Sequence, residues 1–160
     1  MTETESCLPT FTDELERQLD SGLRVPLPKD WRSPLLTELF LITDSSNSFI
    51  KALPITEYRK FIDVIKSDTT LNRTERNECL EEIASSVKRV ELDSAGRLAL
   101  PSKMCEAIGI EGKNTKVILR GADETFNIWN PARLKERLEK KKTLTASGQE
   151  PLSAKKVIGV

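Results

Sequence analysis

The sequence predicts an α+β fold made of two tandem copies of one structural unit. Residues 92–103 read LDSAGRLALPSK, and a diverged copy, LDSGLRVPLPK, lies 73 residues upstream at residues 19–29. Each copy places an aspartate four residues before an arginine across a glycine-bearing turn. An apolar strand and a proline that can begin a helix then follow. The order strand, turn, strand, helix is therefore expected twice.

The segments after the two motifs also correspond. In each copy, two apolar runs separated by a polar turn indicate a pair of strands, and a proline precedes a helical pattern. These strands are residues 39–42 and 49–53 in the first copy and 117–119 and 126–130 in the second, followed by Pro54 and Pro131. Since the later elements are 77 residues apart, about four residues are inserted near residues 110–115.

The other elements of the first copy follow from local patterns. Residues 11–18 alternate weakly between apolar and polar and predict the opening strand. A short helix begins at residues 31–34, where Pro34 disturbs it. Residues 57–66 predict a longer helix with apolar residues spaced by three and four positions, so one face is expected to be buried. That face consists of Tyr58, Phe61, Ile62 and Ile65.

A connecting helix and a strand lead into the second copy. The helix is expected at residues 73–85, with Cys79, Leu80 and Ile83 facing inward, and the strand at residues 87–92. Two further helices are expected at residues 101–108 and 131–142. Gly109 is suited to the left-handed conformation that ends the first of these. Asn130 is a candidate N-cap for the second, whose C-terminal lysines suit the negative pole of the helix dipole.

These elements divide the chain into five segments around one core. They are a flexible N-terminal segment (1–10), a first repeat (11–66), a linking helix (67–86), a second repeat (87–142) and a flexible C-terminal tail (143–160). With 160 residues, of which 38% are hydrophobic, the two repeats are expected to share one compact unit. Trp31 and Trp129 are interpreted as packing anchors.

The residue types present argue against catalysis. The chain has no histidine, which removes the commonest general base and metal ligand. Its cysteines, Cys7, Cys79 and Cys105, share no metal-ligand or redox spacing, and we expect a cytoplasmic protein without a secretory leader. No phosphate-binding glycine pattern is present. The sequence therefore predicts a protein that is not an enzyme, without catalytic residues, cofactor, metal site, membrane association or small-molecule substrate.

The charges are distributed unevenly although the net charge is zero. Residues 1–86 carry 10 basic and 16 acidic residues, whereas residues 87–160 carry 15 basic and 9 acidic ones. A head-to-tail ring would bring an acidic face of one subunit against a basic face of the next at every interface. The alternative is that these charges are solvated helix faces with no partner.

At these motifs the chain resembles the MraZ family, a duplicated member of the SpoVT/AbrB-like class of bacterial DNA-binding proteins. The resemblance covers about residues 11–142. It rests on the doubled Asp-x-x-x-Arg motif with a following proline, on Phe11 nine residues before Asp20, and on the link carrying Arg73 and Arg76. It implies two pseudo-symmetric, intertwined repeats that form a β-barrel-like core with flanking helices. It also implies a ring-shaped homo-oligomer that regulates the division and cell-wall gene cluster through promoter repeats.

The resemblance implies double-stranded DNA as a partner, and a cytoplasmic, nucleoid-associated location. Arg24 is the candidate for reading a base edge or groove phosphate, and Lys29 and Arg32 are candidates for binding phosphates. The alternative interpretation of the pairs Asp20–Arg24 and Asp93–Arg97 is a structural ion pair that locks each turn. We favour that interpretation for Arg97, which lies in the half that the resemblance makes structural.

The first copy departs from the family pattern. Thr12 and Asp13 stand where the family has a basic residue and a glycine, and Gly22 and Leu23 stand where a basic residue and a glycine precede the motif arginine. Fewer cations reduce phosphate affinity. The competing function is therefore a ring-forming assembly or protein-interaction module that has lost specific DNA binding.

Overall fold

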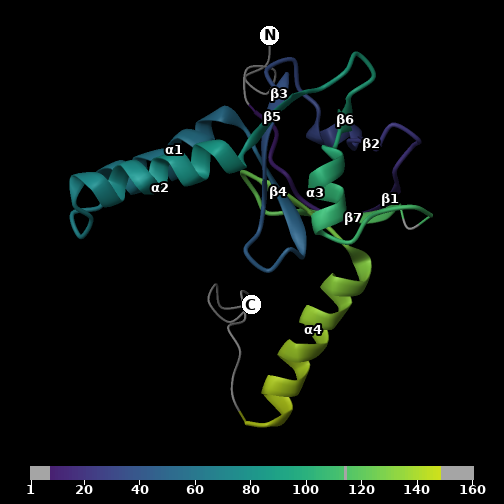
Figure 1. Ribbon diagram of the computed structural model, residues 1–160. Coiled ribbons are helices and arrows are strands. Elements are labelled where there is room, and N and C mark those ends of the chain that lie inside the picture. The colour runs from purple at the N-terminus through teal and green to yellow at the C-terminus, as the bar shows by residue number, and fades with distance from the viewer. Residues whose placement is uncertain (1–7, 114, 149–160) are drawn as a thin grey trace. The chain divides into compact units, whose positions relative to one another are not determined.

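The computed structural model of the chain describes residues 8–113 and 115–148. The chain forms two compact parts, residues 1–130 and residues 131–160. The first part holds all the described strands together with helices α1, α2 and α3, and the second holds helix α4 (Figure 1).

Both copies contain the predicted order of elements, and the α+β class is confirmed. The first copy comprises β1 (Glu14–Gln18), β2 (Arg24–Pro26), a 3₁₀ helix (Lys29–Trp31), β3 (Glu38–Thr43), β4 (Phe49–Leu53) and α1 (Ile55–Ser67). The second comprises β5 (Lys88–Glu91), β6 (Arg97–Ala99), α3 (Ser102–Ala107), β7 (Lys116–Gly121), β8 (Phe126–Trp129) and α4 (Pro131–Ala146). Helix α2 (Arg73–Ser86) links the two copies.

The strand order shows that the copies are intertwined. Six strands form one antiparallel sheet in the order β1-β7-β8-β4-β3-β5, and β2 and β6 form a separate two-stranded ribbon. Read from either end, the sheet passes through equivalent strands of opposite copies, so the opening strand of each copy pairs with the third strand of the other. Strands β1 and β5 are the edges of the described sheet, which is open rather than closed into a barrel.

Equivalent hydrogen bonds support this pseudo-two-fold relation. The amide of Leu19 donates to the carbonyl of Thr115 at 3.0 Å, and that of Leu92 donates to the carbonyl of Thr37 at 2.9 Å. Leu19 and Leu92 are 73 residues apart, whereas Thr37 and Thr115 are 78 apart. The inserted residues therefore precede Thr115, as the sequence predicts.

The core lies between one face of the sheet and the inner face of the ribbon. Inward residues of the four central strands, among them Leu39, Ile50, Leu119 and Ile128, are completely buried. A cluster of aromatic rings closes one end: Phe11 lies 5.5 Å from Trp31 and 5.0 Å from Phe126 between ring centroids. Each large apolar side chain buried here contributes about 2 kcal/mol. The prediction that Trp31 is a packing residue is confirmed.

Two elements of the first copy differ from the predictions. The opening strand begins at Glu14 rather than at residue 11, because Asp13 has a φ of 86° and interrupts the extended backbone after Phe11. The short helix ends at Trp31 instead of beginning there. Pro34 disfavours helical backbone at the residue before it, so the chain turns away.

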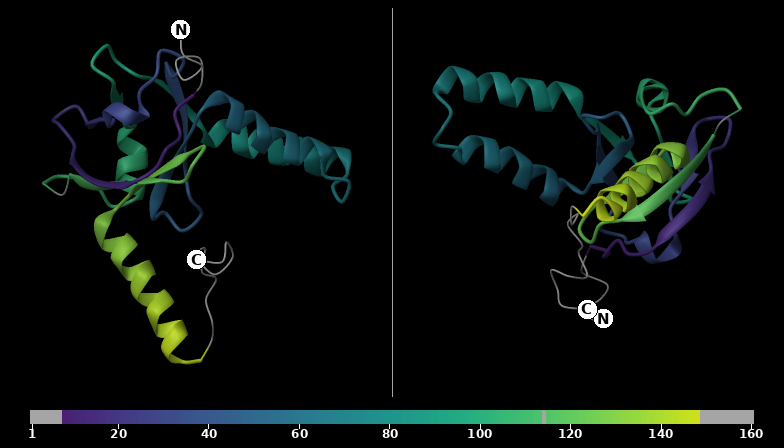
Figure 2. Two further views of the ribbon diagram at one scale, coloured as in Figure 1. Left: turned by 180° about the vertical axis from the view of Figure 1, so that it is seen from behind. Right: turned by 90° about the horizontal axis from the view of Figure 1, so that it is seen from below.

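Helices α1 and α2 form an antiparallel hairpin that extends away from the strands (Figures 1 and 2). The prediction that one face of α1 is buried is wrong, since none of its residues is fully buried. Tyr58 stacks on Phe40 at 4.6 Å between ring centroids, but Phe61, one turn further along, is 41% exposed. Only the beginning of the helix therefore covers the sheet.

The helices of the second copy agree with the predictions at their starts. Helix α3 ends before Gly109, whose φ of 79° is the predicted left-handed conformation. Helix α4 begins at Pro131 and continues to Ala146, so the first residues of the predicted tail are helical. Residues 149–160, like residues 1–7, lie outside the described residues. No helix of the described chain combines the length and the apolar character needed to cross a membrane.

Candidate nucleic-acid interface

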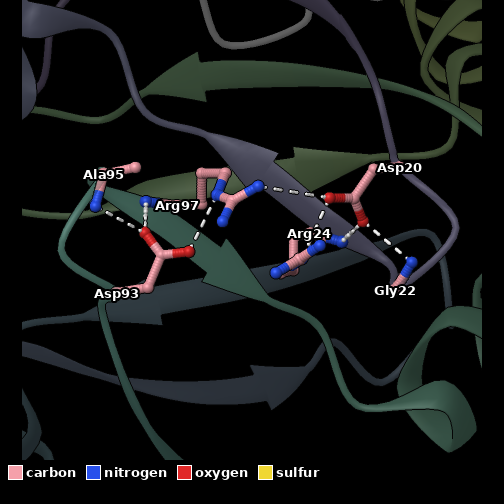
Figure 3. Close-up of polar contacts among 6 residues, drawn as sticks. All are labelled: Asp20, Gly22, Arg24, Asp93, Ala95 and Arg97. Carbon is pink, nitrogen blue, oxygen red and sulfur yellow. Dashed lines mark hydrogen bonds and ion pairs between the residues drawn. The ribbon is translucent and has the colours of Figure 1, made fainter.

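The two motif copies meet in the ribbon formed by β2 and β6. Val25 pairs with Leu98 at its centre, and both side chains are completely buried. Because side chains alternate along a strand, the flanking positions lie on the opposite, outer face. Arg24 and Arg97 occupy that face in two-fold-related positions, opposite Ala99 and Pro26 (Figure 3).

The turn before each arginine is organised by an aspartate. Asp20 Oδ1 accepts hydrogen bonds from the backbone amides of Gly22 and Arg24, both at 2.9 Å, and its Oδ2 accepts one from Arg24 Nε at 2.9 Å. Asp93 Oδ1 accepts from the amides of Ala95 and Arg97 at 2.9 and 2.8 Å, and its Oδ2 accepts from Arg97 Nε at 2.8 Å. The two turns thus have the same geometry.

The arginine side chains keep an exposed end. Each is bound by its own aspartate through Nε, and the side chains of Arg24 and Arg97 are 41% and 37% exposed. Arg97 Nη1 also lies 3.8 Å from Asp20 Oδ2, which links the two pairs across the ribbon (Figure 3). The four charges sum to zero, so the ribbon itself is an ordered but electrically balanced surface.

Both carboxyl groups are held in the charged form. The backbone hydrogen bond from Arg24 is the main cause that holds the pKa of Asp20 below its ordinary value of 3.8, and the amide of Gly22 and the guanidinium of Arg24 add to it. The pKa of Asp93 is lowered in the same way, chiefly by the backbone hydrogen bond from Arg97. Each turn therefore prefers a negative charge at its centre.

These shifts predict an acid-dependent stability of the ribbon. Because the folded-state pKa lies below the unfolded value of 3.8, the contribution of each aspartate is present above that value and is lost as pH falls through the folded pKa. We expect the variant D20N/D93N to be less stable than the wild-type chain at about pH 7, and the difference to shrink at about pH 3. Urea unfolding at both pH values measures it, and a difference that is the same at both would contradict the assignment.

Lys29 and Arg32 do not lie beside the turn of their own copy. They line a groove of about 460 Å³ together with residues 92–96 of the second copy. Arg32 Nε donates to the carbonyl of Leu27 at 2.8 Å, and a Cβ at Gly96 would come within 2.8 Å of that nitrogen. The structure therefore groups Lys29 and Arg32 with the turn of Asp93 and Arg97, a grouping that spacing along the sequence did not indicate.

The groove has no cationic counterpart in the other half. The position equivalent to Arg32 in the second copy is Cys105, which is 1% exposed, and burial raises the pKa of its thiol to about 11. Within the described residues there is no group of three or more carboxylate or thiol side chains that could hold a metal ion. The arrangement is thus suited to binding an anion on one side of the ribbon.

Comparisons with known proteins agree with this motif arrangement. The family model described as "MraZ protein, putative antitoxin-like" matches residues 83–152. A protein of Dehalococcoides mccartyi, named "Transcriptional regulator MraZ", is 33% identical over 122 residues, which cover 75% of this chain and 82% of the relative. The chain belongs to the MraZ family. A second MraZ protein with the same name, from Treponema pallidum, is 25% identical over 142 residues, 89% of this chain and 93% of its own length.

The backbone explains two departures from the MraZ pattern. Asp13 and Leu23 stand where the family resemblance expects glycine, and they have φ values of 86° and 58°. Gly96, the equivalent of Leu23 in the second copy, has a φ of 73°. Both substituted positions thus keep the left-handed conformation that favours glycine. The MraZ turn geometry is preserved in the first copy although its residue types have changed.

Proposed function

We propose that this chain is a sequence-specific, DNA-binding transcriptional regulator of the MraZ type. It acts as a ring-shaped homo-oligomer on tandem promoter repeats of the division and cell-wall gene cluster, in the cytoplasm and associated with the nucleoid. The observation that carries the proposal is the outer face of the β2–β6 ribbon, where two aspartate-bound arginines expose their guanidinium ends. The curated relatives are named as transcriptional regulators.

The ribbon has the dimensions and chemistry of a DNA reader. The major groove admits a two-stranded β-ribbon, and a guanidinium can donate two hydrogen bonds to one guanine. Asp20 and Asp93 bind their arginines through Nε, which leaves the Nη groups directed to the exposed end. An arginine fixed in this way loses less side-chain freedom when it binds a base.

Phosphate binding is assigned to the groove beside the ribbon. Lys29 and Arg32 are exposed and line the groove next to the turn of Asp93. Their two positive charges have the phosphate backbone as their natural partner. Because Arg97 belongs to the same turn, we include it with Arg24 as a DNA-contacting residue.

A ring compensates for the weak binding of one subunit. The four charged residues of the ribbon balance, so a single subunit gains little from long-range attraction to DNA. Several subunits that present the same ribbon to tandem repeats bind with a high effective concentration, provided that the spacing of the repeats matches the spacing of the subunits.

The second candidate function is a ring-forming assembly or protein-interaction module without specific DNA binding. It is favoured by Thr12, Asp13, Gly22 and Leu23, which remove cationic residues from the first copy and add one acid. The two functions differ in what they require of the ribbon. The first needs its arginines for binding, and the second needs them only for the turns.

A shift assay on DNA from the chain's own promoter tests the proposal. We expect a saturable shift at about 0.1 M salt that weakens by more than tenfold at about 0.3 M salt, because cations released from the phosphates oppose binding. A scrambled fragment of equal length is the control and should shift only at higher protein concentration. Equal affinity for both fragments, or no shift at low salt, would favour the assembly module.

A further inference from the structure

Helix α2 has an acidic outer face. Glu78 and Glu82 are four positions apart and Glu81 lies three positions after Glu78, so the three carboxylates share one side of the helix. All three side chains are exposed, and no described residue forms an ion pair with any of them. Arg76 does not offset them, because its Nη2 donates to two carbonyls of the hairpin turn at 2.9 and 3.1 Å.

This face opposes the stability of the helix on its own. Carboxylates at these spacings repel one another, and the C-terminal end of a helix disfavours negative charge. The last turn of α2 contains no basic residue. The helix starts from a capping box, in which Asn72 Oδ1 accepts from the Glu75 amide at 2.8 Å and Glu75 Oε1 accepts from the Asn72 amide at 2.9 Å. The capping box fixes where α2 begins, but it leaves the repulsion along its outer face uncompensated.

The same hairpin exposes apolar side chains. On α1, Phe61 is 41% exposed and Val64 is 68% exposed. A groove of about 570 Å³ runs between α1 and α2, and its apolar lining includes Tyr58, Ile62 and Leu80. An apolar groove beside an acidic face fits a helix that is both leucine-bearing and basic.

Helix α4 of every copy has that character. It carries six basic and two acidic residues. Leu138 is 38% exposed, and Lys141 and Lys142 follow it by three and four positions, so both lysines lie on the side of the helix that carries the leucine. The composition of α4 therefore matches the hairpin in both charge and apolar character.

We propose that α4 of one copy packs on the α1–α2 hairpin of a second copy, with Leu138 over the groove and the lysines facing the acidic side of α2. This inference rests on the ring assembly of the proposed function and identifies its interface. The contact joins two different surfaces, so each copy uses its hairpin for one neighbour and its α4 for the other, as a closed ring requires.

Charge exchange between the two helices tests the interface. We expect E78K/E82K and K141E/K142E each to lower the molar mass in solution at least twofold at about 0.1 M salt, and the four-fold variant to restore the wild-type mass. Lysine and glutamate have similar helix propensities, so the helices are retained. K103E/K113E and E106K/E111K, made at exposed positions of the second copy, are matched controls that should keep the wild-type mass. Light scattering without DNA provides the measurement, and about 1 M salt should reproduce the effect of either reversal in the wild-type chain.

Three outcomes would overturn the interface: both reversals keep the wild-type mass, the four-fold variant fails to recover it, or K141E/K142E keeps the mass and weakens the promoter shift. The last result would make α4 a DNA contact. Failure of the regulatory function is a separate result, because it requires that the wild-type chain fails to shift its promoter whatever its mass.

Discussion

Replacing Gly121 with alanine is expected to destabilise the chain by on the order of 3 kcal/mol, enough to lower the melting temperature by roughly 10 °C. A Cβ at this position would lie 2.6 Å from the backbone carbonyl carbon of Phe11 and 2.8 Å from that of Thr12. These are backbone atoms and cannot rotate away. Phe11 is completely buried against Trp31 and Phe126, so the displaced segment would disturb the aromatic cluster.

Gly112 provides the control for this substitution. A Cβ there would meet no atom within 4 Å, but Gly112 has a φ of 60°. Its replacement by alanine should therefore cost about 1 kcal/mol, from backbone conformation alone. Thermal and urea unfolding of both variants separate the two effects. A G121A chain as stable as G112A would show that the close approach of Phe11 and Gly121 does not exist in solution.

Replacing Arg24 with alanine is expected to weaken operator binding by about 100-fold or more, with molar mass and melting temperature nearly unchanged. The loss is large because every subunit of a ring on tandem repeats loses the same contact. Stability changes little because a half-exposed ion pair contributes less than about 1 kcal/mol. The shift assay, light scattering and thermal melting measure these three quantities.

Arg97 and Arg120 make this test specific. From the sequence we expected Arg97 to act in structure, but its environment is equivalent to that of Arg24, so R97A should lose affinity by a similar factor. Arg120 Nε binds Glu14 Oε1 at 2.9 Å on the sheet and is 40% exposed, so R120A removes a comparable ion pair away from the ribbon. R120A should bind as the wild-type chain does. Unfolding of R24A, or equal losses in all three variants, would contradict the role proposed for the ribbon.

The duplication made much of the fold predictable from the sequence. The two motif copies and the paired apolar runs predicted every strand of the sheet, and Gly109 marked the end of α3 as predicted. The exchange of strands between copies was implied only by family resemblance. Pairing depends on which edges meet in space, and an apolar pattern specifies the buried face of a strand but not its neighbour.

The candidate site was less accessible to sequence reasoning. The aspartate and arginine spacing identified both turns, because four residues across a tight turn bring the two side chains together. Nothing local could place Lys29 and Arg32 beside the turn of Asp93, since that contact crosses between the copies. The apolar face of α1 misled for a related reason: its spacing predicts burial, and within one chain it is only half covered.

The palindromic strand order has a consequence for how this protein can come apart. Neither copy contains the partner of its own opening strand: β1 needs β7, and β5 needs β3. A polypeptide with one copy alone would expose unpaired edges and could satisfy them only by associating with a second such polypeptide. The tandem gene therefore encodes what is physically a homodimer fused into one chain, and its two halves must melt as a single cooperative unit.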